Sequence, residues 1–472
     1  MPTSDSYPTA ADPKAPDAMP PETTGPARPA LDPSLSSWSR KDTAFVAAVM
    51  LGSLGLFVWY LAQNVGRSFG DEANYLVLAD RILKNGLWEL REELRTYLYP
   101  LVLALAKTFF GAGVASKGLV SIAQYWVFLL TLRLVARTVA KLTQKKSAGL
   151  LVFAAAALNP YLVQATTLFL TDILAACLVA CAFTKLLFGN LRLRRDVLLA
   201  TLPFAAAVMI RPASAIFVPV AWLGVVVRHY VEPIPLRKVV LGFVLSSAFF
   251  VPQLHMNVSQ FKHWTPIIHT PLYSLQTQEA VRCLKYGTAV IPGEKAPLCF
   301  ANPLADKSCK SMQALALKSP LVFAYTAAAH VFGVFDWGYI DAYIPSYYPR
   351  NRLPASILLH STWFLAAIGF IRFVRRRREL PAGKSALLFF LAAAIVADLG
   401  FLATIQVESR FGYPIFLMAM PFLGFAIPDS RPSRKLMVVT ALSWLLWMGL
   451  STILSFWLDS LTGRILWFSH FK

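Results

Sequence analysis

The chain has 472 residues, of which 56% are hydrophobic and only 15% are charged. A soluble domain carries roughly 25% charged residues, whereas this chain contains many apolar runs close to the roughly 20 residues that span a bilayer. The composition therefore excludes a soluble globular protein and predicts a polytopic membrane protein.

The formal net charge is +20, from 45 Lys and Arg against 25 Asp and Glu. Basic residues gather in the short cytoplasmic loops of membrane proteins, where anionic lipid headgroups attract them. The sequence has no nucleic-acid motif and no groove pattern of aromatic and basic residues. We therefore expect membrane lipids as partners and no nucleic acid.

Residues 1–41 are rich in Pro, Ala, Ser and Asp and have almost no large apolar side chains. Such a segment buries too little surface to fold alone, so we expect a disordered cytoplasmic tail. Arg40 and Lys41 directly precede the first apolar run, as is typical of a cytoplasmic end. The transmembrane domain is predicted at 42–472.

The first predicted span, from about Thr43 to Ala62, leads into an outer loop at 64–116 that carries the adjacent acids Asp71 and Glu72. Charged residues then alternate with an apolar face at helical spacing, made by Tyr75, Leu76, Leu78, Ala79, Ile82 and Leu83. That pattern is typical of a helix lying in the membrane interface.

The next apolar segment, Leu98–Gly113, is short for a span and carries Lys107, so we place it at the interface as well. The span 117–139 then runs inward, which puts Lys141, Lys145 and Lys146 inside and Asp172 outside. This agrees with the positive-inside rule. The second large outer region is 256–352, and its apolar segment Pro320–Phe335 is also placed at the interface. The predicted fold class is an all-α polytopic membrane protein with about eleven transmembrane helices.

The five cysteines fall into two groups. Cys177 and Cys181 lie in an apolar run, where packing is the expected role. Cys283, Cys299 and Cys309 lie in the second outer region, where an oxidising compartment would allow one disulfide. Which two of the three pair stays open.

The predicted topology brings charged residues from distant parts of the chain to one face. Arg211 lies near that face, which carries Asp71, Glu72, Asp172, Glu408 and Arg410. Ionisable groups at membrane depth are costly and usually functional, although a charge in a surface loop needs no such explanation.

Each acid has two interpretations. Asp71 and Glu72 are either helix N-terminal acids favoured by the dipole or a general base for an attacking hydroxyl. Asp172 is either a helix cap or a second acid that binds substrate hydroxyls or a divalent metal. The metal interpretation is the weaker one, because no second acidic ligand lies nearby in the sequence.

The arginines also have two interpretations. Arg211 and Arg410 are either snorkelling side chains at helix ends or guanidinium groups that bind phosphate oxygens bidentately. In the second case they stabilise the negative charge on a leaving phosphate, and Glu408 orients Arg410.

A set of segments, taken in order, resembles the GT-C superfamily of polytopic glycosyltransferases: DEANYLVLADRILKNGLW, YLYPLVLALAKTFFG, ALNPYLVQATTLFLTD, RP and ESRFGYP. The chain is most similar to the branch with the protein O-mannosyltransferases and the bacterial lipid A aminoarabinose transferases. The resemblance implies a membrane enzyme that transfers a sugar from a polyprenyl-phosphate carrier to a lipid, glycan or protein acceptor, with inversion, at the extracytoplasmic face. It implies no cofactor.

The resemblance also implies roles for single residues. The catalytic acid of the first loop in that family matches Asp71, with Glu72 beside it, and the second acid matches Asp172. The arginine that contacts the donor phosphate matches Arg410, with Glu408 two residues before it.

Further substrate contacts are expected from Arg211, Tyr97 and Tyr99. The two tyrosines suit the membrane interface and are expected to contact sugar rings. They also mark a departure from the family, because Tyr97, Tyr99 and Pro100 stand where many relatives have a Pro-Pro or Lys-Pro pair.

Two other classes of protein are alternatives. A transporter or lipid flippase predicts ionisable residues in mid-span and paired half repeats, whereas the charges here lie mainly at span ends. A structural membrane component predicts that the acids do not converge. The Ala- and Arg-rich composition favours a bacterial inner membrane, with the active site on the periplasmic face.

Overall fold

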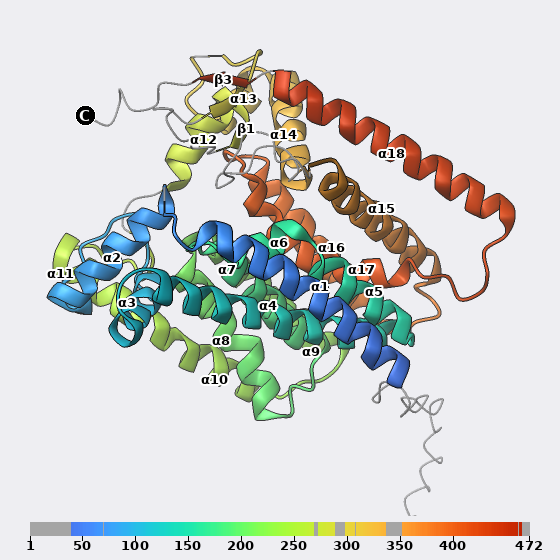
Figure 1. Cartoon of the computed structure of the whole chain (residues 1–472), viewed down its shortest axis with the longest axis horizontal. Coiled ribbons are helices and arrows are strands. Elements are labelled where there is room, and N and C mark those ends of the chain that lie inside the picture. Colours follow the sequence, from blue (N-terminus) through green and yellow to red (C-terminus); the bar gives the residue numbers. More distant parts are fainter. Residues whose placement is uncertain are drawn as a thin grey trace, which may run out of the picture.

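A computed structural model of the chain describes residues 39–68, 70–268, 272–287, 298–306, 308–336, 352–460 and 462–464. Most of the predicted N-terminal tail therefore lies outside the described residues. The described part is a bundle of helices, with α12, α13 and the strands at the top of the view and α2, α3 and α11 at its left (Figure 1).

The first third of the chain is helical, with α1 (Arg40–Asn64), α2 (Asp71–Asn85), η2 (Leu87–Glu89), α3 (Leu98–Phe110), α4 (Val114–Thr143), α5 (Lys146–Ala157), α6 (Pro160–Ala165), α7 (Asp172–Phe188) and α8 (Arg194–Ile210). The middle third adds η3 (Pro212–Ile216), α9 (Phe217–Val231), α10 (Leu236–Ser246), η4 (Ser247–Phe250), α11 (Val251–Phe261), α12 (Leu272–Arg282), β1 (Cys283–Gly287), β2 (Leu298–Ala301), α13 (Met312–Lys318) and α14 (Pro320–Phe335). The last third contains α15 (Arg352–Arg376), α16 (Ala382–Leu402), η5 (Ser409–Gly412), α17 (Tyr413–Phe425), α18 (Arg434–Ser460) and β3 (Thr462–Arg464).

The polytopic membrane architecture is confirmed. Within the described residues, seven helices are long and apolar enough to cross a membrane: Arg40–Asn64, Val114–Thr143, Pro212–Val231, Leu236–Phe261, Pro354–Arg376, Ala382–Leu402 and Arg434–Leu458. The other predicted spans correspond to shorter helices, namely α5 with α6, α7, α8 and α17.

Helix α17 forms the centre of the bundle. Nearly all of its residues are buried, and it packs against α4, α5, α7 and α15. Small residues permit this close approach: a Cβ atom at Gly369 of α15 would overlap the carbonyl oxygen of Phe422, and one at Gly424 would overlap the side chain of Val139.

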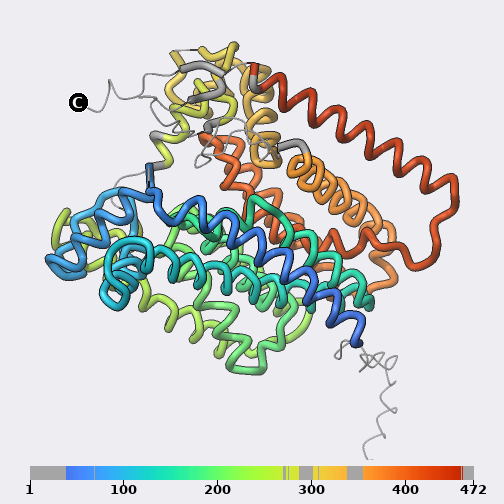
Figure 2. Tube along the Cα trace, in the orientation of Figure 1, coloured from blue at the N-terminus to red at the C-terminus, as the bar shows by residue number. Residues whose placement is uncertain are grey.

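Helices α2 and α3 pack against each other at the left end of the bundle, near α11 (Figure 2). Gly70 precedes α2 with a φ of 58°, a left-handed conformation that glycine adopts without strain. The buried face of α2 includes Tyr75, Leu78, Ala79 and Ile82, so the predicted amphipathic helix is present.

The prediction of an all-α chain missed a small sheet. Strands β1, β2 and β3 form an antiparallel sheet in that order. Helices α12 and α14 pack against β1, and α13 packs against both of these helices; we call these six elements the loop subdomain. Cys283 of β1 is disulfide-bonded, while Cys177, Cys181 and Cys309 are free. The side chain of Cys299 lies outside the described residues.

Candidate active site

Four helix ends bring charged side chains together. Asp71 and Asp172 are the first residues of α2 and α7, Arg211 directly follows α8, and Arg410 lies in η5. The N-terminal end of a helix dipole favours a carboxylate, so the local structure supports both acids in their ionised form.

Arg410 is the centre of this group. Its Nη2 lies 3.1 Å from Oδ2 of Asp71, and its Nη1 lies 3.2 Å from Oδ2 of Asp172. Its Nε donates to Oε2 of Glu408. One guanidinium therefore contacts three carboxylates, and its side chain is only 11% exposed.

Two further arginines complete what we call the charge cluster. Arg211 is ion-paired with Oδ1 of Asp172, and its guanidinium lies 4.5 Å from the ring centre of Phe411. Arg95 donates to Oδ1 of Asp71 at 2.8 Å. The charge cluster comprises Asp71, Arg95, Asp172, Arg211, Glu408 and Arg410.

The two acids of the charge cluster differ in exposure. The side chain of Asp172 is 4% exposed, whereas that of Asp71 is 34% exposed. Burial raises the pKa of Asp71, but the guanidinium groups of Arg410 and Arg95 outweigh it and lower this pKa to about 2. Asp71 is therefore ionised at neutral pH, and it is the acid that a substrate can reach more easily.

Glu72 does not join the charge cluster. It is 1% exposed, and its Oε1 lies 3.0 Å from Nζ of Lys117 and accepts the Phe169 N–H at 2.6 Å. Asp71 and Glu72 are adjacent in the sequence, but the helix turns them toward different partners. Glu72 joins the start of α2 to α4 and to the segment before α7, so it supports the position of Asp71.

Tyr97 and Tyr99 are also not brought to the charge cluster. Both are buried; the Tyr97 hydroxyl donates to the Phe249 carbonyl at 2.9 Å, and the Tyr99 hydroxyl donates to Gln124 at 3.2 Å. These bonds join the start of α3 to η4 and to α4. The ring of Tyr99 lies 5.2 Å from that of Tyr75, and the Arg95 guanidinium lies 5.4 Å from the centre of the Tyr75 ring.

Sequence reasoning missed two charged residues near the site. Arg95 lies among several loop charges, and nothing in the sequence distinguishes it from them. Asp398 lies in the apolar helix α16, is 5% exposed, and interacts electrostatically with Arg211. Asp398 could have been identified from the sequence, because an ionisable residue within an apolar span is usually functional.

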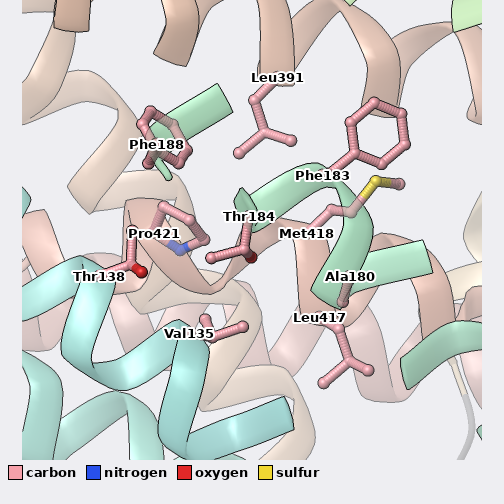
Figure 3. A pocket seen from close by; sticks show the side chains of 10 residues that line it. All are labelled: Val135, Thr138, Ala180, Phe183, Thr184, Phe188, Leu391, Leu417, Met418 and Pro421. Carbon is pink, nitrogen blue, oxygen red and sulfur yellow. The ribbon is translucent and has the colours of Figure 1, made fainter. Parts of the chain in front are cut away.

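The described residues contain no group of three or more His, Cys, Asp or Glu side chains arranged to hold a metal ion. A small pocket lies between α4, α7, α16 and α17 (Figure 3). Apart from Thr138 and Thr184, its lining is apolar. The pocket begins at Ala180, about 12 Å along α7 from Asp172, and is separate from the charge cluster.

No protein-family profile matches the chain, and no curated protein matches it in sequence. A solved structure does match: the crystal structure of ArnT from Cupriavidus metallidurans bound to undecaprenyl phosphate. The TM-score is 0.51 at 12% identity, and the match covers 85% of this chain and 63% of the ArnT chain. The protein therefore spans less than two thirds of ArnT, and it has an ArnT-like polytopic membrane fold.

Proposed function

We propose that this protein is a membrane glycosyltransferase that moves a sugar from a polyprenyl-phosphate donor to an acceptor hydroxyl. One observation carries the proposal: Arg410 joins Asp71 and Asp172, which lie 339 and 238 residues before it in the chain. Buried ionisable groups that converge in a membrane protein are usually functional. The likeness to ArnT, whose structure holds undecaprenyl phosphate, adds support for the donor class.

The donor phosphate would bind to the guanidinium groups of Arg410 and Arg95. Guanidinium binds phosphate oxygens bidentately and stabilises the charge that develops on a leaving phosphate. Arg211 adds positive charge behind Asp172, and Glu408 fixes the orientation of Arg410 through its Nε.

Asp71 would act as the general base. It takes the proton of the acceptor hydroxyl while the hydroxyl oxygen bonds to the anomeric carbon and the bond from that carbon to the phosphate oxygen breaks. Attack opposite the leaving phosphate inverts the anomeric carbon. A positioned base contributes roughly 10²–10⁴-fold to such a reaction, and Asp172 would orient the substrate hydroxyls.

The low pKa of Asp71 fits this scheme if phosphate and Asp71 compete for the same two arginines. Arg410 and Arg95 lower the pKa of Asp71 to about 2, and a carboxylate that is so stabilised is a weak base. A phosphate that takes over these guanidinium groups raises the pKa of Asp71. Donor binding would thereby strengthen the base at the step that needs it.

The donor lipid cannot leave the bilayer, so its phosphate must be bound at the level of the lipid headgroups. Helices α2 and α3 lie beside the charge cluster and carry exposed apolar residues such as Val77, Leu105 and Phe109, which suits an interfacial position. We place the site on the periplasmic face of a bacterial inner membrane, with a lipid, glycan or protein as acceptor.

The test is sugar transfer by purified protein reconstituted with undecaprenyl-phosphate sugars and envelope extract, with products identified by mass spectrometry. Asp71→Asn should lower the rate by about 100-fold or more. Asp80→Asn is the matched control, because Asp80 lies on the same helix, is 63% exposed and pairs with Lys107. Full activity of a correctly inserted Asp71→Asn protein would remove the proposed role.

A transporter or lipid flippase is the second candidate, and Asp398 within α16 is the observation that favours it. Protein in detergent distinguishes the two. A transferase forms a glycosylated product there, whereas a transporter needs two compartments and forms none.

A further inference from the structure

His330 of α14 makes an unusual pair of contacts. The residue is fully buried. Its Nδ1 lies 2.9 Å from the carbonyl oxygen of Ala403, and its Nε2 lies 2.8 Å from the carbonyl oxygen of Cys283. Both ring nitrogens therefore face hydrogen-bond acceptors.

A carbonyl oxygen only accepts hydrogen bonds, and a neutral imidazole has only one N–H to donate. Both contacts are satisfied together only when the ring is doubly protonated. Two features of the surroundings offset part of the cost of burying that cation: Ala403 is the C-cap of α16, and Cys283 follows the last residue of α12. The C-terminal ends of two helix dipoles thus converge on His330 and stabilise positive charge there.

The two carbonyl groups belong to different parts of the molecule. Ala403 begins the segment 403–408, which connects α16 to η5 and ends at Glu408 of the charge cluster. Cys283 begins β1 and is held in a disulfide. His330 therefore joins the segment that delivers Glu408 and Arg410 to the loop subdomain.

Two further contacts strengthen this junction. The N–H of Gln406, within the same segment, donates to the carbonyl of Gln276 in α12 at 3.0 Å. Helix α14 itself packs against η5, which carries Arg410. His330 lies at the point where the loop subdomain and the charge cluster meet.

We propose that His330 is a positioning residue for the transferase: its ring ties Ala403 to Cys283 and so holds the 403–408 segment where Arg410 faces Asp71 and Asp172. This inference rests on the proposed function for its effect on rate, but the junction itself does not. His330 acts through Arg410 and does not touch the reacting atoms.

The charge of His330 makes the junction sensitive to pH. Burial lowers the pKa of His330, while its hydrogen bonds to the backbone of Cys283, Ala403 and Ala280 oppose that change. Charged or titratable groups on the elements packed around α14 are Glu279, Arg282, Lys285, Lys318, His360, Lys384, Asp398, Glu408 and Arg410, and Asp336 is the C-cap of α14 itself. Both hydrogen bonds are present together only below this lowered pKa, so the junction loses one of the two bonds as pH rises through it.

The experiment compares three variants of the full-length protein in nanodiscs: His330→Phe, His330→Gln, and His263→Gln as an exposed-histidine control. His330→Phe should lower kcat for transfer from an undecaprenyl-phosphate sugar about tenfold or more, with little change in KM. It should also speed hydrogen exchange of a peptide covering 403–410. His330→Gln keeps a neutral N–H donor, so it should retain more of kcat and lose the fall in rate with rising pH.

Three results would overturn the inference: unchanged kcat and exchange in folded His330→Phe, a pH dependence that survives in His330→Gln, or equal effects of His263→Gln. Hydrogen exchange separates the two claims. If the unaltered protein transfers no sugar but His330→Phe still speeds exchange, the proposed function is refuted and the inference about the junction is supported. Unchanged exchange in an active enzyme would refute the junction alone.

Discussion

Asp71 is the residue on which the proposed chemistry depends, and its environment is set by two arginines from different parts of the chain. Arg95 comes from the loop after η2 and Arg410 comes from η5. Together they lower the pKa of Asp71 from 3.8 to about 2. These ion pairs therefore stabilise the folded protein above about pH 4, and that contribution is lost as pH falls toward 2.

Replacing Arg95 should move the titration of Asp71. In Arg95→Gln one of the two guanidinium groups that lower its pKa is absent, so this pKa should rise. The acid limb of kcat/KM, which reports groups of the free enzyme, should then shift to higher pH. Arg91→Gln is the control, because Arg91 lies over Phe261 and not at Asp71. An acid limb in the same place for both variants would contradict this account of Asp71.

We expect the buried ion pair of Glu72 and Lys117 to affect the free energy of unfolding. Removing one partner of a buried ion pair costs about 3 kcal/mol or more, whereas removing both charges costs far less. In detergent, Glu72→Gln and Lys117→Met should each lower the unfolding temperature strongly. The double variant should regain most of that temperature. A double variant whose loss equals the sum of the two single losses would refute this role.

At the level of the helices, side-chain spacing predicted which segments form helices but not which neighbours they have. Spacing identified the apolar face of α2, and four of its six predicted residues are buried: Tyr75, Leu78, Ala79 and Ile82. It did not separate Asp71 from Glu72, because adjacent residues point about 100° apart on a helix and only tertiary packing decides which one meets Arg410. For the same reason spacing did not show that the hydroxyl groups of Tyr97 and Tyr99 have partners on η4 and α4.

The close approach of α15 and α17 gives a prediction about Gly369. A Cβ atom there would overlap the Phe422 carbonyl group, whereas a Cβ atom at Gly449 of α18 meets nothing within 4 Å. Gly369→Ala should therefore cost about 1–3 kcal/mol through overpacking. Gly449→Ala should be neutral or slightly stabilising, because alanine favours a helix over glycine. Equal unfolding temperatures of the two variants would mean that α15 and α17 can separate freely.

For the whole molecule, hydrophobic runs and loop charges were enough to predict a polytopic bundle in which Asp71, Asp172, Arg211, Glu408 and Arg410 share one end. The membrane constrains a chain so strongly that alternation alone brings such loops together. The sheet of the loop subdomain was missed, because β1, β2 and β3 are short and lie outside the apolar runs. The role of His330 was invisible too, since it depends on two distant carbonyl groups.

The proposed orientation is tested by labelling single cysteines in a background without the free Cys177, Cys181 and Cys309. Basic residues after α15 should lie in the cytoplasm, so a membrane-impermeant maleimide applied to spheroplasts should not label Arg377→Cys. It should label Ser308→Cys in the loop subdomain; both positions are exposed. The reverse pattern would place the charge cluster on the cytoplasmic face.

The most direct measurement is the affinity of the reconstituted protein for undecaprenyl phosphate. If the lipid phosphate and Asp71 compete for Arg410 and Arg95, Asp71→Asn should bind the lipid more tightly than the unaltered protein, and Arg410→Gln should bind it about tenfold more weakly or worse. Asp80→Asn should bind as the unaltered protein does. Equal binding by all of these proteins, or weaker binding by Asp71→Asn, would contradict a phosphate site at the charge cluster.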